Sequence, residues 1–312
     1  MKSFEARLVD AVREKREAEG LSIRGLSAVV GISFSTLARI ERGDGVPDNN
    51  SKIRLLEWLG QDADDAGLGF DNVALVHFRA GKNVRSQTVQ ALLTAAECIK
   101  RSRPREDVAD AEPSTAADHE PVIVSKEELE RTAEQFRKEL GLSDNQPLDS
   151  LRLNVDGVEL IRLQETDCID SATVRRLSTV SCDEWSAMSV PLDERQNEWA
   201  VLLNDCHTPE RQRVTFLEEI WHILLGHKLV KIAKVAEAYG RTYDSSEEHD
   251  AYYLASATLL PRKAIVRAVE KRESSEGIAR QFGTSPELVE YRIKRLGLWR
   301  DYVGKRVALT PA

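Results

Sequence analysis

The sequence predicts a mainly α-helical protein that has a bundle of short helices at its N-terminus, then a linker, then an α+β domain. Three observations lead to this fold class. Apolar residues recur at helical spacing through the first sixty residues, the composition changes after residue 100, and short β-like runs then precede a long helical stretch. Strands followed by helices are typical of an α+β domain. A chain of 312 residues exceeds the size of one hydrophobic core, so two or three domains are expected.

The N-terminal segment contains the capping and turn residues expected of a compact helical bundle. Gly20 ends a first helix, Ser22 and Ser33 are suited to cap the second and third, and Gly31 supplies the sharp turn between those two. We expect this domain to span residues 1–65. Residues 66–100 are expected to form a helical extension, with helices over 73–79 and 86–100.

The second half begins after a stretch that lacks the residues needed for a core. Residues 101–125 are rich in proline, alanine and acidic residues and contain no aromatic residue, which predicts a flexible linker. In residues 126–312 a helix over 126–140 opens the domain, and β-like runs follow at 158–163, 185–190 and 199–203. The order of Thr208, Pro209 and Glu210 indicates a helix start. From there the sequence indicates helix almost to the end.

Composition and charge restrict the class of protein. The formal net charge is −8, which argues against a protein that coats DNA indiscriminately but allows a local basic face. The four cysteines are scattered, so neither a disulfide framework nor a cysteine-rich zinc site is expected. No apolar run approaches the ~20 residues that span a bilayer, and the N-terminus lacks an apolar signal region. We therefore expect a cytoplasmic protein with no membrane partner.

Residues 21–43 satisfy the requirements of a helix that enters the major groove of DNA. Such a helix needs a second helix that braces it across a short turn, and outward side chains near its N-terminal end. The sequence from Gly31 to Gly43 reads GISFSTLARIERG, with Leu37 and Ile40 directed inward and Arg39 outward. A small helical bundle used for protein contact is the alternative.

This motif closely resembles the phage-repressor (Xre/Cro) helix-turn-helix family over roughly residues 4–60. The resemblance implies a double-stranded DNA operator as partner and binding as a homodimer, for which residues 66–100 are the candidate contact. Phe34 departs from the family, where a polar or basic residue is usual, and it would contact a thymine methyl group. The resemblance assigns Phe34, Ser35 and Arg39 to base edges and Ser22, Thr36 and Arg42 to phosphates; Ser33, which begins the helix, completes the DNA-binding set.

The most informative stretch after the linker is residues 213–227, RVTFLEEIWHILLGH. On a helix Glu218 and His222 leave the same face, and Glu219 lies beside them, close enough to hold a water molecule. This is the layout of a zinc-peptidase helix, with two ligands at i and i+4 and a general base next to the first. Glu248, at the start of a later helix closed by Pro261, is the natural third ligand.

These two helices resemble the ImmA/IrrE family of metallopeptidase-like domains, within residues 126–295. The resemblance implies a zincin-like α+β fold, with Glu218, His222 and Glu248 as metal ligands and Glu219 as catalytic base. The family has a histidine where this chain has Glu218. The resulting oxygen-rich set accepts zinc but also suits another divalent metal such as manganese or iron.

Other interpretations of these residues remain open. Glu218 and Glu219 can be solvated acids on a helix surface, and His222 a core histidine that finds its hydrogen bonds there. His227 lies five residues beyond His222, so we expect it to point away from that face and to be structural. Residues 275–300 also have the pattern of a helix-turn-helix, with Arg292, Lys294 and Arg295 as its charges. Packing against the peptidase-like helices is expected there rather than DNA contact.

Three functions are compatible with this organisation. In the first, the chain is a sequence-specific transcription regulator, a repressor, whose C-terminal domain senses a signal or cleaves the chain itself or a partner protein. In the second, it is an active metalloendopeptidase that its DNA-binding head recruits to DNA-bound substrates. In the third, the C-terminal domain is catalytically inactive and binds a ligand.

Overall fold

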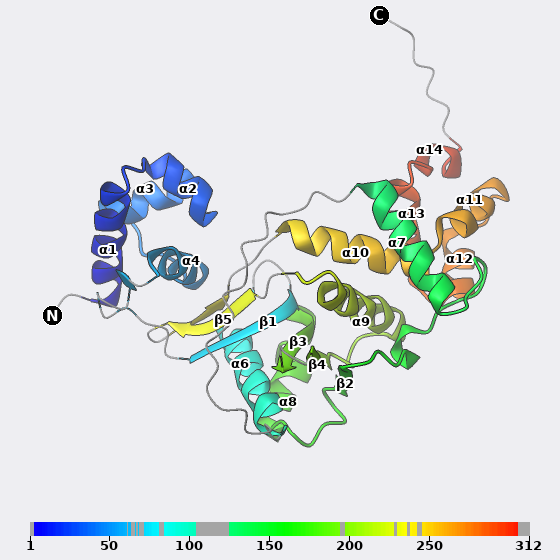
Figure 1. The fold of residues 1–312 in the computed structure, drawn as a ribbon, viewed down its shortest axis with the longest axis horizontal. Helices are drawn as coiled ribbons and strands as arrows, with labels where there is room; N and C mark the ends of the chain where they lie inside the picture. The colour runs from blue at the N-terminus through cyan, green and yellow to red at the C-terminus, as the bar shows by residue number, and fades with distance from the viewer. Residues whose placement is uncertain are drawn as a thin grey trace, which may run out of the picture. The chain divides into compact units, whose positions relative to one another are not determined.

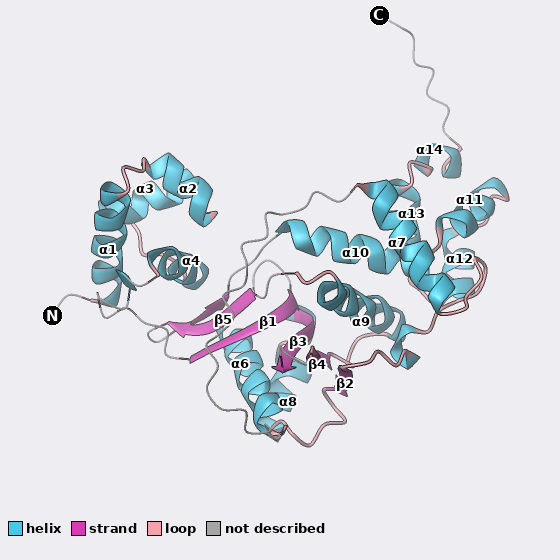
Figure 2. Ribbon diagram, in the orientation of Figure 1, coloured by secondary structure: helices cyan, strands magenta, loops and turns pink. Residues whose placement is uncertain are grey.

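A computed structural model describes residues 3–60, 62–63, 66, 68, 72–80, 84–103, 125–193, 197–227, 230–235, 238–241 and 245–304 (Figure 1). The chain divides into two compact units. The first comprises Met1–Ser102, Asp167–Trp185 and Leu229–Asp244; the second comprises Arg103–Thr166, Ser186–Lys228 and Ser245–Ala312. Most of the expected linker, residues 104–124, lies outside the described residues. Helix is the dominant secondary structure, as the sequence predicts (Figure 2).

Four helices open the first unit: α1 (Phe4–Ala18), α2 (Ile23–Val30), α3 (Phe34–Arg42) and α4 (Asn49–Leu59). Their apolar residues meet in one core that contains Leu8, Leu26, Leu37 and Ile53. The predicted caps are present, since the Ser22 hydroxyl accepts a hydrogen bond from the Gly25 N–H at 3.0 Å. The four-helix bundle expected in this segment is confirmed.

Among the described residues of the first unit are three strands that the sequence did not predict. β1 (Asn72–Ala80) pairs antiparallel with β5 (Val230–Val235), which pairs antiparallel with β6 (Ala238–Arg241). The expectations of a helix over 73–79 and of continuous helix after residue 208 were therefore wrong. β5 contains the β-branched residues Val230, Ile232 and Val235, and the pairing of β1 with β5 joins parts of the chain about 150 residues apart, which local periodicity cannot reveal.

The expected helix over 86–100 is confirmed as α6 (Ser86–Arg101). Within the first unit it contacts a segment made of α8 (Ser171–Arg175), the turn of π-helix η2 (Arg176–Val180) and the 3-10 turn η3 (Cys182–Glu184). The buried Thr88 hydroxyl lies 2.8 Å from that of Ser181 and donates to Glu184.

In the second unit the predicted strands pair in the order β2-β4-β3. β2 (Val158–Arg162) is parallel to β4 (Glu198–Leu203), and β3 (Trp185–Asp193) is antiparallel to it, with Ala187 opposite Leu203. Helix α9 (Pro209–Leu224) packs on these strands, because Phe216 and Ile220 share a core with Ala187 and Val201.

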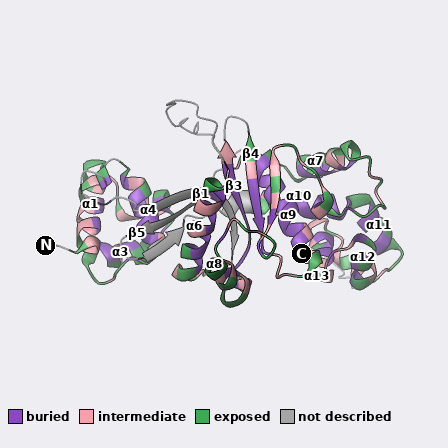
Figure 3. Cartoon of the chain, turned by 90° about the horizontal axis from the view of Figure 1, so that it is seen from below, coloured by how far each residue is buried: buried purple, intermediate pink, exposed green. Residues whose placement is uncertain are grey.

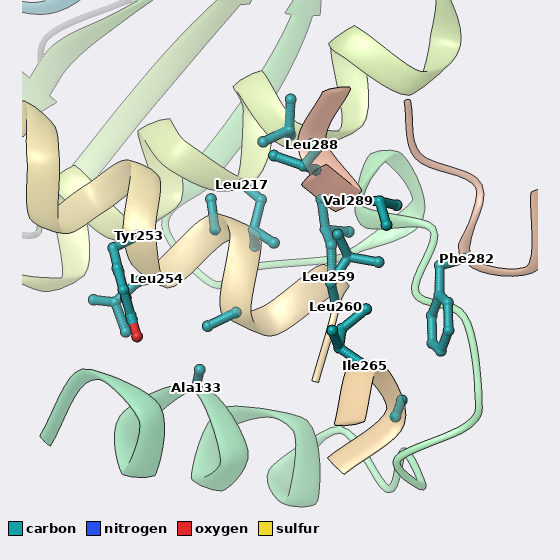
Figure 4. Close-up of a cluster of buried hydrophobic side chains, with 14 of the residues drawn as sticks. Ala133, Leu217, Tyr253, Leu254, Leu259, Leu260, Ile265, Phe282, Leu288 and Val289 are labelled. Atoms are coloured by element: carbon teal, nitrogen blue, oxygen red, sulfur yellow. The ribbon is translucent and has the colours of Figure 1, made fainter. Parts of the chain in front are cut away.

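The other helices described in the second unit share one apolar core with α9. They are α7 (Lys126–Glu139), α10 (Ser245–Leu259), α11 (Arg262–Glu270), α12 (Ser275–Phe282), α13 (Pro286–Arg295) and α14 (Trp299–Tyr302); the 3-10 turn η1 (Ser150–Arg152) precedes β2. α10 packs against both α9 and α7. Their side chains converge on one apolar core, in which Ala133, Leu217 and Leu254 meet residues of the last helices (Figure 4).

The buried residues lie mainly on the sides of the helices and strands that face these cores (Figure 3). Within the described residues, no single helix is long and apolar enough to cross a bilayer, and only the bent pair α2 and α3 passes that test together, by length and composition alone.

A buried network of charged and polar side chains links α13 to α7 and α10. Arg292, which is fully buried, donates to both carboxylate oxygens of Glu130 at 2.6 and 2.7 Å and to the Leu260 carbonyl at 3.0 Å. The Tyr253 hydroxyl donates to the same carboxylate at 2.6 Å. Of the three charges that the sequence assigned to the second helix-turn-helix pattern, Arg292 is not available to a partner, because its guanidinium is buried and hydrogen-bonded inside the domain. The expectation that this segment packs against the domain's other helices is confirmed.

Removing the guanidinium is expected to destabilise the second unit strongly. We expect Arg292→Ala to lower the free energy of unfolding by about 3–5 kcal/mol, because it leaves the Glu130 carboxylate buried without its cation. Urea denaturation followed by tryptophan fluorescence measures the loss. Arg131→Ala, which removes an exposed arginine from α7, is the control and should cost less than ~1 kcal/mol. Equal losses for the two variants would contradict a fastening role.

The same pair predicts how stability depends on pH. Burial by itself would raise the pKa of Glu130, but the hydrogen bonds and charge of Arg292 and the Tyr253 hydroxyl lower it below the ordinary value of 4.5. A carboxylate with a lowered pKa adds stability above 4.5, and that stability is lost as the pH falls through the folded-state pKa. The stability difference between wild type and Glu130→Gln should therefore be constant well above pH 4.5 and shrink below it. A difference independent of pH across this range would refute the assignment.

Candidate functional site

The first candidate site is the surface formed by α2 and α3. The two helices meet at an angle of 119° across the turn of residues 31–33. Gly31 adopts a left-handed conformation, with φ of 63°, and the Ser27 hydroxyl donates to the Ile32 carbonyl at 2.6 Å. An angle of about 90–120° over a three- or four-residue turn containing glycine is characteristic of a helix-turn-helix.

Helix α3 separates its residues as the sequence predicts. Leu37 and Ile40 are buried in the bundle, whereas the outward face is exposed to solvent. Phe34 is 46% exposed, which is unusual for a large aromatic side chain. The predicted DNA-binding residues are all exposed: Ser22, Ser33, Phe34, Ser35, Thr36, Arg39 and Arg42. Their roles toward DNA stay predictions.

Several of these side chains have local partners that set their positions. The Ser33 hydroxyl accepts from the Thr36 N–H at 3.2 Å and so caps α3. The guanidinium of Arg24, on α2, lies over the Phe34 ring at 5.2 Å from its centroid. Arg42 pairs with Asp44 at 3.0 Å, although both side chains are exposed and the pair adds little stability. Arg24 was not selected from the sequence, yet the structure adds it to this face.

A partly buried ion pair fixes α3 against α1. Arg16 donates to both oxygens of Glu41, at 2.6 and 2.9 Å, and to the Leu21 carbonyl at 2.9 Å. The hydrogen bond to Glu41 raises the pKa of Arg16, although burial works in the opposite direction. Because Glu41 follows Ile40 on the inner side of α3, this pair helps to hold the outward face in one orientation.

The second candidate site is the polar face of α9. Glu218 is 1% exposed, Glu219 0% and His222 4%, so none of them is a solvated surface residue. The interpretation of the two glutamates as solvated surface acids was therefore wrong. Glu218 and His222 are one helical turn apart, on neighbouring positions of one face.

Strand β3 contributes a residue that the sequence did not single out. The buried Ser189 hydroxyl donates to Glu219 at 2.5 Å. This hydrogen bond holds one carboxylate oxygen of Glu219 in a fixed position against β3. A serine within a mainly apolar strand was the available signal, because a buried hydroxyl requires a hydrogen-bond partner.

His227 lies against His222, contrary to the expectation that it points away. The Nδ1 atoms of the two rings are 2.9 Å apart, and the rings meet edge to face with centroids 4.9 Å apart. The expectation was wrong because it extended the helix through residue 227. α9 ends at Leu224, and the chain reverses at Gly226, so His227 returns to the end of the helix.

The predicted third ligand lies on the neighbouring helix. Residue 248 is in the first turn of α10, three and seven residues before Ala251 and Ala255, which are buried in the core that contains Leu217 of α9. The side chain of Glu248 itself lies outside the described residues. Within the part of the chain that the structure describes, no set of three ligand atoms within 4.8 Å of one another includes His222. A complete ligand set therefore requires a further residue, and Glu248 stays the predicted one.

The chemistry of this donor set fits a divalent cation. Imidazole nitrogen suits zinc and iron, and carboxylate oxygen suits manganese and magnesium. Two buried carboxylates on one helix are costly to desolvate unless positive charge or hydrogen bonds compensate. Glu218, Glu219 and His222 have the donor types that such an ion requires.

Two protein-family models match the chain. Residues 12–57 match the helix-turn-helix family, and residues 184–294 match the Peptidase M78 family, described as an IrrE N-terminal-like domain. No curated protein and no solved structure matches significantly. The first match covers α2, α3 and their turn; the second begins just before β3 and includes α9 and α10. The domain limits of 1–65, 66–100, 101–125 and 126–312 stay predictions.

Proposed function

We propose that this chain, which joins an Xre-type helix-turn-helix to an IrrE N-terminal-like, metallopeptidase-like domain, is a sequence-specific transcription regulator that acts as a repressor. The single observation that carries the proposal is the exposed outer face of α3, held at 119° to α2. Such a face serves to read base edges in the major groove.

The α3 face has the donors and the apolar surface for direct readout. Arg39 can donate two hydrogen bonds to guanine, the Ser35 hydroxyl can bond to any base, and Phe34 offers a surface for a thymine methyl group. The Arg24 guanidinium beside Phe34 adds a positive charge near the phosphates. Ser22, Thr36 and Arg42 lie at the ends or edges of the two helices, where phosphate contacts fix the register on the duplex.

Two copies of the chain would read two half-sites. Proteins of this architecture bind as dimers whose half-sites are about one helical turn apart. We assign the dimer contact to residues 66–100, the same segment that the sequence analysis favours.

The second module is proposed to hold a divalent metal, zinc in the first instance, through Glu218, His222 and Glu248. Such an ion, when bound, would polarise the carbonyl of a peptide bond. Glu219 would then accept a proton from water and return it to the departing amine. Ser189 would keep the Glu219 carboxylate in place through its hydrogen bond.

Three uses of this module follow. It cleaves the chain itself or a partner protein and thereby ends repression; it is an endopeptidase that the DNA-binding head recruits to DNA-bound substrates; or it is a catalytically inactive sensor. The Ser189–Glu219 hydrogen bond orients a base, as the first two uses require, and it would equally compensate the burial of Glu219 in a sensor.

The readout function is tested on the outer face of α3. We expect Ser35→Ala with Arg39→Ala to weaken sequence-specific binding by roughly 10- to 1,000-fold, since each base contact is worth about 1–3 kcal/mol. The preferred duplex is first selected from a random pool with the wild-type chain, and affinities are then measured by electrophoretic titration at fixed salt.

The control for that experiment is Arg131→Ala, which also removes an exposed positive charge, but from the second unit. Binding to an unrelated duplex should change little in both variants. If the double variant is well folded and still prefers the selected duplex as strongly as wild type, α3 is not the reading helix.

The role of proteolysis is tested at Glu219. We expect Glu219→Gln to keep operator affinity and bound metal but to abolish release of repression and any cleavage product, because the amide cannot accept the proton. A reporter gene behind the selected duplex measures repression, and electrophoresis of the purified chain measures cleavage. Glu210→Gln, in the first turn of α9, is the control. Normal regulation by Glu219→Gln would exclude proteolysis as the mechanism and favour the sensor.

A further inference from the structure

The turn at the end of α9 brings two histidines together. Gly226 has φ of 62°; its N–H donates to the Ile223 carbonyl at 3.1 Å, and the His227 N–H donates to the His222 carbonyl at 3.1 Å. These two bonds form a Schellman motif, in which the residue after the left-handed glycine returns to the residue five positions earlier. Residues 222 and 227 are therefore neighbours because of the backbone.

The two histidine side chains form a hydrogen bond between their Nδ1 atoms. The Nδ1 atoms of His222 and His227 are 2.9 Å apart. A neutral imidazole carries its proton on one ring nitrogen, so one of these atoms must donate and the other accept. Two arrangements are possible, and they differ in what the opposite nitrogen of His222 can do.

The direction of this hydrogen bond decides whether His222 can bind a metal through Nε2. If the His222 Nδ1–H donates to His227, Nε2 of His222 keeps its lone pair for an ion. If His227 donates instead, Nε2 of His222 carries the proton and cannot coordinate. A histidine ligand generally donates its other N–H to a partner outside the coordination sphere, which fixes its tautomer and its orientation.

We propose that His227 is the positioning residue of the metal centre: its Nδ1 accepts the hydrogen bond from Nδ1–H of His222 and leaves Nε2 of His222 to coordinate the ion. This inference rests on the proposed metal-binding function. Where other metal sites use a carboxylate or a carbonyl to orient the ligand, this chain uses a second imidazole, delivered by the turn at Gly226.

Gly226 is required for its conformation. A Cβ built on Gly226 would meet no atom within 4 Å, so space is not the constraint. Its positive φ disfavours other residues, with asparagine the best tolerated and β-branched residues the worst. The turn can therefore be altered without removing either imidazole.

The experiment uses the full chain and Zn²⁺ in competition with a chromophoric chelator. We expect His227→Ala and Gly226→Val to weaken Zn²⁺ binding about 10- to 100-fold, the usual cost of losing such a partner. His227→Asn, whose side-chain oxygen can accept the same hydrogen bond, and Gly226→Asn, which tolerates the turn, should stay within about threefold of wild type.

A second readout follows the tautomer directly. In ¹⁵N-histidine spectra of the Zn²⁺-loaded wild type, His222 should carry its proton on Nδ1; in His227→Ala that preference should be weakened. Wild-type Zn²⁺ affinity and an unchanged His222 tautomer in His227→Ala would overturn the role of His227 and leave the metal centre standing. Failure of the wild-type chain to bind Zn²⁺ would overturn the metal centre itself, and the inference with it.

Discussion

The burial of two carboxylates and an imidazole on α9 is the constraint on which the second unit depends. Charge in a protein interior is costly unless opposite charge or hydrogen bonds surround it, and Glu218, Glu219 and His222 are all within a few per cent of full burial. The neighbouring elements supply hydrogen bonds to these buried groups. β3 directs the Ser189 hydroxyl to Glu219, and the turn after α9 brings His227 to His222. A helix built only for packing would carry leucine or alanine at these positions.

Both units use the same device to hold their helices in register, a bidentate arginine–carboxylate pair. In the first unit Arg16 donates two hydrogen bonds to Glu41 and so fixes α3 against α1. In the second unit Arg292 donates two hydrogen bonds to Glu130 and so fixes α13 against α7. Such pairs add geometric definition rather than large net stability, because desolvation offsets much of their attraction. Their value here is orientation. The first pair orients the exposed face of α3 that is proposed to contact DNA. The second pair holds α13 in the group of helices that includes α9 and α10.

The features that could be predicted from the sequence are those set by interactions between residues close together in the chain. Helix caps such as Ser33 act within one turn, and the outward position of Arg39 follows from a period of 3.6, so the helix-turn-helix was predicted nearly residue by residue. The i and i+4 spacing of Glu218 and His222 likewise placed them on one face. The pairing of β1 with β5 could not be predicted, because it joins distant parts of the chain. β5 and β6 form a local hairpin, which was missed because the segment after residue 208 was interpreted as continuous helix. The contact of His227 with His222 was missed because it depends on where α9 ends, and the boundaries of elements are their least predictable feature.

The most direct test of the metal centre on α9 is anomalous diffraction at the zinc absorption edge from crystals of the Zn²⁺-loaded chain. We expect one peak about 2.1 Å from Nε2 of His222, with the carboxylates of Glu218 and Glu248 as further ligands and His227 outside the coordination sphere. A well-ordered crystal with zinc bound elsewhere, or with no peak beside α9, would contradict the assignment. The buried polar face of that helix would then be a feature of packing.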